Sequence, residues 1–130
     1  MIADKDTNKS MTTTARGRWG ETLAAAHFKT LGYTLVARNW RHQKFEIDLI
    51  VCTDDQWVFV EVKTRKKGYF ECALEAVDLG KQERIIKAAH QYILRQSNGT
   101  KAVRFDILCV EYGHTGWRIQ HIPDAFISLP

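Results

Sequence analysis

Four charged residues lie at corresponding positions in two neighbouring apolar segments of the chain. Glu46 and Asp48 alternate with apolar residues in the first segment, and Glu61 and Lys63 do so in the second. Val, Ile, Phe and Trp fit a pleated, half-buried surface, and the intervening Thr-Asp-Asp-Gln is typical of a turn, so the pattern predicts a β-hairpin. Acids and a lysine on one face of a hairpin are a candidate metal-binding and catalytic group.

The length of the turn determines which of these side chains face each other. If the two turn aspartates are its central residues, Asp48 lies opposite Glu61, and Glu46 lies opposite Lys63. Opposed residues have Cβ atoms about 4.5–5.5 Å apart, and like charges at that spacing are destabilising. Mg²⁺ would compensate, because it takes hard oxygen ligands from converging carboxylates and completes its shell with water and phosphate oxygens. Lys63 would then orient a water or stabilise charge on a phosphate.

Alternation predicts which apolar residues share a face within each expected strand. One face of the first strand carries Phe45, Ile47, Leu49 and Val51, and one face of the second carries Val58, Val60 and Val62. The second strand has the pattern of one buried on both sides, where an acid is rarely tolerated without a partner. The alternative is a surface ion pair between Glu46 and Lys63, with the other acids solvated on an open sheet face.

Length and composition limit the classes of protein to which the chain can belong. With 130 residues, 45% of them hydrophobic and 26% charged, we expect one globular domain over residues 16–130, after a polar, disordered tail over residues 1–15. No long apolar run predicts a membrane span, and the N-terminus is too polar for a secretory signal, so we expect a cytoplasmic protein. The five histidines are scattered without the spacing of a zinc site.

Basic residues border the acidic hairpin on both sides. The formal net charge is +4 and the sequence pI is about 9.1, a mild bias toward polyanions. We expect a phosphate-tracking rim of Arg38, Arg41 and Lys44 before the hairpin, Arg65, Lys66 and Lys67 after it, and Lys81 and Gln82 farther along. Solvated loops and an exposed helix end are the alternative explanation for these residues.

The remaining segments predict two helices and three further strands. Residues 16–31 have a broad apolar arc, and residues 78–96 form a second helix with Asp78 as its N-cap. Strands are expected over 33–40, 101–111 and 117–122, the last at an edge, with Arg104 and Asp106 as a structural pair. The order helix, three strands, helix, two strands indicates a mixed sheet packed between helices.

Glu21 lies at the edge of the apolar arc of the first helix. Its helical spacing with Gly17, Ala24 and Phe28 turns it toward the sheet, where it would be a third acid beside the hairpin. The alternative is a glutamate favoured by the dipole of the first helical turn and paired with Arg18.

Several motifs together resemble a known family. Asp48 followed by Glu61-Val62-Lys63 resembles the PD-(D/E)xK nuclease signature. The wider set resembles the YraN-like family of small bacterial proteins: Gly17-Arg-Trp-Gly-Glu21, Gly32-Tyr33, Arg38-Asn39-Trp40-Arg41, Glu46-Ile-Asp48-Leu-Ile50, Phe59-Val-Glu-Val-Lys-Thr-Arg65, Glu75-Ala-Val77, Lys81-Gln82, Arg104-Phe-Asp106 and Ala125-Phe126. The resemblance implies an α/β fold with a restriction endonuclease-like αβββαβ core, a mixed central sheet flanked by helices, akin to archaeal Holliday junction resolvases.

The resemblance also implies roles for individual residues. Asp48 and Glu61 would bind Mg²⁺ or Mn²⁺ together with the backbone carbonyl of Val62, Lys63 would be the catalytic lysine, and Glu21 would be an auxiliary catalytic and metal-binding acid. Two positions depart from the family pattern. Phe45 stands where the family usually has glycine before Glu-Ile-Asp, and Glu71 stands where a glycine normally follows the aromatic residue of the loop.

The function expected from these features is metal-dependent hydrolysis of phosphodiester bonds in DNA, branched or otherwise structured. A homodimer fits this expectation, because one active site per chain needs a second copy to cut both strands of a junction. The alternative is a non-catalytic nucleic-acid-binding module that keeps the nuclease fold.

Overall fold

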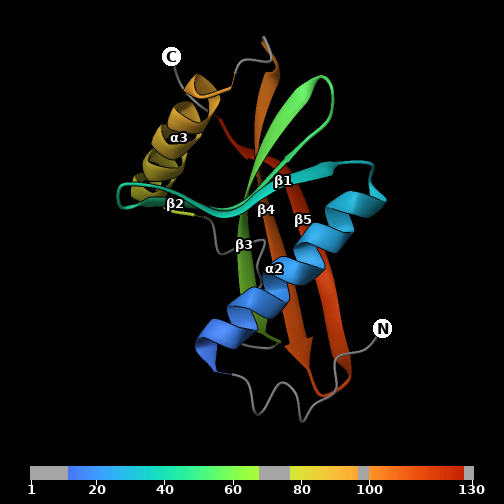
Figure 1. The fold of residues 1–130 in the computed structure, drawn as a ribbon. Helices are drawn as coiled ribbons and strands as arrows, with labels where there is room; N and C mark the ends of the chain where they lie inside the picture. The colour runs from blue at the N-terminus through green and yellow to red at the C-terminus, as the bar shows by residue number, and fades with distance from the viewer. Residues whose placement is uncertain (1–11, 68–76, 97–99, 128–130) are drawn as a thin grey trace.

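Two helices and five strands make up the computed structural model, which describes residues 12–67, 77–96 and 100–127 (Figure 1). In chain order they are α2 (Thr13–Thr30), β1 (Thr34–His42), β2 (Phe45–Cys52), β3 (Gln56–Lys66), α3 (Leu79–Leu94), β4 (Ala102–Gly113) and β5 (Gly116–Phe126). The strands form one sheet in the order β1-β2-β3-β4-β5, in which only β3 and β4 run parallel. The expected mixed α/β arrangement and element order are confirmed.

Each helix covers one face of the sheet, as the sequence predicts. On the α2 face, Ala24 and Phe28 pack against valines and leucines of β2, β3 and β4. On the α3 face, Ile85 and Tyr92 pack against aromatic and aliphatic residues of the same strands. Within the described residues, no helix is long and apolar enough to cross a membrane.

The helix boundaries follow from their N-caps. The Thr12 hydroxyl accepts a hydrogen bond from the Ala15 amide at 3.1 Å, so α2 begins three residues before the expected start, and the expected tail is wrong for its last residues. Residues 1–11 lie outside the described residues. The predicted cap of α3 is confirmed, because the Asp78 carboxylate accepts the Lys81 amide at 2.8 Å.

The predicted hairpin register is confirmed close to the turn and lost farther from it. Four pairs run from Cys52↔Trp57 to Leu49↔Val60, and beyond them β2 remains paired with β1 alone. The β2–β3 ladder does not extend to Glu46 and Lys63, so their expected opposed positions are wrong: Glu46 lies opposite Arg41 on β1 and binds its guanidinium at 3.3 Å. The β1–β2 hairpin projects from the sheet past α3 (Figure 1).

The divergence of β2 from β3 also changes the faces of the first hairpin strand. Leu49 and Val51 belong to the core under α2, as predicted together with Val58 and Val60. Phe45 and Ile47 instead join the core under α3, so the assignment of one face to the whole strand is wrong. Simple alternation fails where β2 loses β3 as a neighbour and remains paired with β1 alone.

The predicted pair of Arg104 and Asp106 is confirmed as a structural element. Asp106 is fully buried and accepts two hydrogen bonds from Arg104, at 2.8 and 2.7 Å. His121 of β5 lies 2.7 Å from the same carboxylate, and the Asp124 amide donates to it at 3.0 Å. Arg104 and His121 lower the pKa of Asp106 against the opposing effect of burial. This network fixes β5 to β4.

Helix α2 comes closest to the sheet at Gly20. A Cβ atom at this position would collide with the Thr64 hydroxyl on β3. Glu21 follows Gly20, and Lys63 precedes Thr64. The absence of a side chain at residue 20 therefore brings an acid of the helix and the lysine of the strand to the same part of the fold.

This contact predicts the effect of Gly20→Ala. Alanine is favoured over glycine inside a helix by about 1 kcal/mol, but here we expect no gain in the free energy of unfolding, because the new methyl group must displace the Thr64 hydroxyl. The gain should appear in a Thr64→Ala background, measured by urea denaturation. Thr64→Val is the matched control, since it keeps a γ-methyl group in the hydroxyl's place. An equal gain from Gly20→Ala in all three backgrounds would contradict the close contact.

Candidate active site

One pocket collects the charged residues that the sequence singles out. It has a volume of about 530 Å³ and lies between the first half of α2, the end of β3 and the start of α3. Its lining includes Glu21, Asp48, Glu61, Val62, Lys63, Arg65 and Lys81. Asp48, Glu61 and Lys63 of the hairpin strands and Glu21 of the helix therefore converge, although they come from three different elements, whereas Glu46 does not line this pocket.

Asp48 lines the pocket beside Glu61. Its Oδ2 accepts the Val62 amide at 2.9 Å, at the point where β2 leaves β3. Burial raises the pKa of Asp48 to about 8, together with the nearby Glu61 carboxyl, which lies within hydrogen-bonding reach, and the more weakly acting Glu21. The bond from the Val62 amide opposes this shift. Near neutral pH Asp48 therefore tends to keep its proton, because a partly buried carboxyl beside another carboxyl group ionises less readily.

Lys81 provides the positive charge that faces the pair. Its Nζ lies 2.7 Å from Glu61 Oε2, and the Glu61 side chain is only 8% exposed. Burial alone would lower the pKa of Lys81, but the Glu61 and Asp48 carboxyl groups raise it. The first turn of α3 therefore carries the counter-charge of the acid on β3.

Glu21 also lines the pocket, where its carboxylate contacts two residues of β1. Its Oε1 accepts Asn39 Nδ2 at 3.0 Å and lies 3.6 Å from Arg38. Asn39 has a positive φ of 50°, a conformation in which asparagine is enriched. Glu21 faces the sheet as predicted, and its described partners are on β1 rather than on its own helix. Among the described residues, no group of three or more His, Cys, Asp and Glu side chains is assembled to hold a metal ion, so a ligand role for Glu21 stays a prediction.

Several of the expected phosphate-binding residues, Lys81 and Arg65 included, are engaged with the protein itself. Arg38 donates to the Arg18 carbonyl and the Thr22 hydroxyl, each at 3.3 Å. Gln82 donates to the carbonyl of Val77 at 2.8 Å, and Arg41 pairs with a neighbouring glutamate across the hairpin. These contacts favour structural roles for Arg38 and Gln82.

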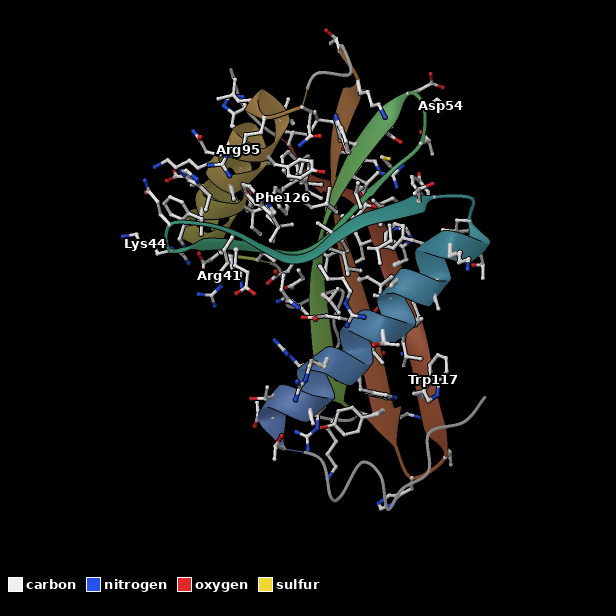
Figure 2. The ribbon with its side chains drawn as sticks, in the orientation of Figure 1. Arg41, Lys44, Asp54, Arg95, Trp117 and Phe126 are labelled. Atoms are coloured by element: carbon white, nitrogen blue, oxygen red, sulfur yellow. The ribbon has the colours of Figure 1, made fainter. Side chains whose placement is uncertain are left out.

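Arg65 also lines the pocket, and the three remaining expected phosphate-binding residues are exposed outside its lining. Lys66 and Lys67 are exposed at the end of β3. Lys44 is exposed at the tip of the β1–β2 hairpin, near Arg41 (Figure 2). The basic rim is therefore interrupted rather than continuous around the acids.

Two functional contacts escape sequence reasoning. Lys81 fits an ordinary exposed helix start, and nothing in its local pattern links it to Glu61, which lies twenty residues earlier. Asn39 carries a weak signal, since asparagine next to a strand end tolerates a positive φ. Its contact with Glu21 depends on how α2 crosses β1.

The raised pKa of Asp48 predicts how stability depends on pH. Unfolding returns its pKa from about 8 to 3.8, so between these values the folded state holds a proton that the unfolded state releases, and rising pH favours unfolding. Asp48→Asn keeps an acceptor for the Val62 amide and removes the ionisation. We expect the variant to gain stability relative to the wild type as pH rises from about 4 to about 8, by up to a few kcal/mol.

Urea unfolding at a series of pH values in EDTA measures this difference. Asp54→Asn, in the exposed turn between β2 and β3, is the matched control. A constant difference between Asp48→Asn and the wild type across the pH range would contradict the close carboxyl pair.

Comparison with known proteins places the chain among relatives of undefined function. A model described as "Uncharacterised protein family UPF0102" matches residues 20–110. A "UPF0102 protein" of Nitratidesulfovibrio vulgaris strain DP4 is 39% identical over 86% of this chain and 84% of its own length. Others from Parabacteroides distasonis and Rhodococcus opacus are each 40% identical over 86% of this chain, and over 92% and 96% of their own lengths.

The family match includes the pocket residues that the sequence singled out as catalytic, since Glu21, Asp48, Glu61 and Lys63 all lie within residues 20–110. The relatives cover most of both chains, and their identity is well above the level at which only a fold is shared. The chain belongs to the uncharacterised protein family UPF0102, the YraN-like family that its motifs resemble.

Proposed function

We propose that this protein is a metal-dependent nuclease that hydrolyses phosphodiester bonds in branched or otherwise structured DNA, on a restriction endonuclease-like core. The observation that carries the proposal is the close carboxyl pair of half-buried Asp48 and buried Glu61 in a pocket that also contains Lys63. An acid with a strongly raised pKa in a pocket, as Asp48 has, is a candidate for function. The order of helices and strands fits the proposed core.

The donor atoms of the pocket suit a hard divalent cation. Asp48 and Glu61 offer carboxylate oxygens, Val62 lines the same pocket, and its backbone carbonyl is a further oxygen ligand of the kind that Mg²⁺ or Mn²⁺ takes. After burial, the nearby Glu61 carboxyl contributes to the raised pKa of Asp48, and a divalent cation between the two groups would offset this repulsion. We therefore assign Asp48, Glu61 and the Val62 carbonyl as the metal ligands, with Glu21 as an auxiliary acid.

Each group in the pocket has a different role in the proposed hydrolysis. When bound, the cation polarises the scissile phosphate and lowers the pKa of the attacking water. Lys63 holds that water in position or stabilises charge that develops on the phosphate. Arg65 and Lys81 line the same pocket and bind phosphate oxygens. A homodimer would supply a second site for the other strand of a junction.

A binding module without turnover is the second candidate. The contact between Lys81 and Glu61 favours it, because an ammonium group at 2.7 Å already neutralises one acid without a metal ion. Such a protein would bind nucleic acid through its basic side chains and cut nothing. The two candidates differ in whether Asp48 and Lys63 matter for catalysis.

The nuclease proposal predicts that Asp48→Asn and Lys63→Ala abolish cleavage while binding persists. We expect each to lower the rate by about 100-fold or more, measured with Mg²⁺ or Mn²⁺ on labelled junction, flap, fork and duplex DNA. Mg²⁺ should also raise the melting temperature of the wild type but not of Asp48→Asn. Asp54→Asn and Lys29→Ala are matched controls, since both residues are exposed and lie outside the pocket.

Two results would decide against this assignment. Cleavage that persists in both pocket variants of highly purified protein would exclude Asp48 and Lys63 from catalysis. Binding without cleavage by the wild type, on every substrate and with either metal, would favour the binding module instead.

A further inference from the structure

Two further hollows extend from the candidate active site along α3. The first, of about 220 Å³, shares Asp48, Glu61 and Lys81 with the pocket. The second, of about 290 Å³, shares Phe45 with the first and ends at His90 and Gln91. We call these two hollows together the α3 trough. It runs between α3 and the β1–β2 hairpin, from the acid pair toward the hairpin tip.

Beyond the acid pair the trough is lined by basic groups. Lys81, Arg84 and Lys87 follow one another at helical spacing on α3, and all three are exposed. Exposed Lys44 faces them from the hairpin side of the first hollow. The remaining acid there, Glu46, is paired with an arginine of β1, and no residue lining the second hollow is acidic. A path of positive charge leading away from a phosphodiester-cutting site suits a polyanionic strand.

The hairpin wall of the trough is held in place by contacts to α3. Arg95 lies 3.0 Å from His42 Nδ1 and its guanidinium stacks 5.5 Å from the centre of the Trp40 ring. Trp40 also meets Tyr92 of α3 edge to face, with ring centres 5.3 Å apart. Figure 2 shows Arg95 at the C-terminal end of α3 and Lys44 at the hairpin tip. The trough is therefore formed before any ligand binds, which lowers the entropic cost of binding.

Phe45 lies where the two hollows meet. Its ring is half-buried, it lines both hollows, and the Lys44 ammonium lies 6.0 Å from its centre. An aromatic side chain in a basic groove is the common platform on which nucleic-acid bases stack. Only an unpaired base offers its face to such a ring, because duplex bases are already stacked on their neighbours. The aromatic residue thus distinguishes a single strand from a duplex.

We propose that the α3 trough binds a single-stranded segment of the nucleic acid next to the cleaved phosphate, with a base stacked on Phe45. The substrates would then be flaps, forks or junctions with unpaired nucleotides rather than uninterrupted duplex. The direction of the strand toward a scissile phosphate rests on the proposed function. Binding of the strand itself does not, and it is measurable without hydrolysis.

The first experiment tests the charge of the trough. Binding of a labelled 20-nucleotide single strand is measured by fluorescence anisotropy in EDTA at several salt concentrations. We expect Arg84→Gln/Lys87→Gln to weaken binding at least tenfold at low salt and to reduce the slope of log K against log salt by about 1.4, since each lost phosphate contact removes about 0.7. Arg18→Gln/Lys29→Gln, an equal change of charge on exposed residues of α2, should leave the slope nearly unchanged.

The second experiment tests the aromatic platform. Phe45→Leu keeps an apolar side chain against the core but cannot stack, so we expect single-strand binding to weaken about fivefold or more with no change in the salt slope. Phe45→Tyr should bind like the wild type, and binding to a blunt duplex should be the same in all three proteins. Melting temperatures confirm that each variant is folded.

The outcomes separate this inference from the proposed function. An unchanged salt slope in Arg84→Gln/Lys87→Gln, or an equal loss in the α2 control, would overturn the trough as the binding path. Equal loss of single-strand and duplex binding in Phe45→Leu would overturn the stacked base. Cleavage that survives Asp48→Asn and Lys63→Ala would overturn the proposed active site and leave these binding results intact.

Discussion

The end of the ladder between β2 and β3 depends on the carboxyl group of Asp48, which takes the place of a backbone carbonyl as a hydrogen-bond acceptor. Asp48 accepts the Val62 amide where strand β2 separates from β3, so the strand ladder ends on a side chain rather than on a carbonyl. A buried amide without an acceptor would cost about 1–3 kcal/mol. The same carboxyl lies beside Glu61 in a partly buried position, which raises its pKa. One residue therefore both ends the hairpin and creates the charge cluster.

The separation of β2 from β3 accounts for both the pocket and the projecting β1–β2 hairpin. Because β2 follows β1 away from the sheet, the end of β3 is free to meet α2 at Gly20 and α3 at Lys81. The departing hairpin packs on α3 through Trp40 and Arg95. A hairpin that stayed paired throughout would bring Glu46 against Lys63 and would fill the space where the pocket lies.

Much of this arrangement follows from the sequence, and the rest depends on contacts between distant segments. Apolar alternation and the Thr-Asp-Asp-Gln turn were sufficient to place Asp48 beside Glu61, and Asp78 was recognisable as a helix cap. The face of Phe45 was predicted wrongly, since alternation assumes that a strand keeps the same neighbours along its length. The pairing of Lys81 with Glu61 was missed, because it depends on the angle at which α3 crosses the sheet.

The ammonium group of Lys81 has a consequence for how the site would take up a cation. Glu61 already has a positive partner and the pKa of Asp48 is raised to about 8, so a cation bound as proposed would exchange with charges that are in place rather than enter a bare cluster. Occupancy would then depend on the free concentrations of both protons and metal. The same exchange would release the lysine at the start of α3, where the trough begins, when the acids acquire a new partner.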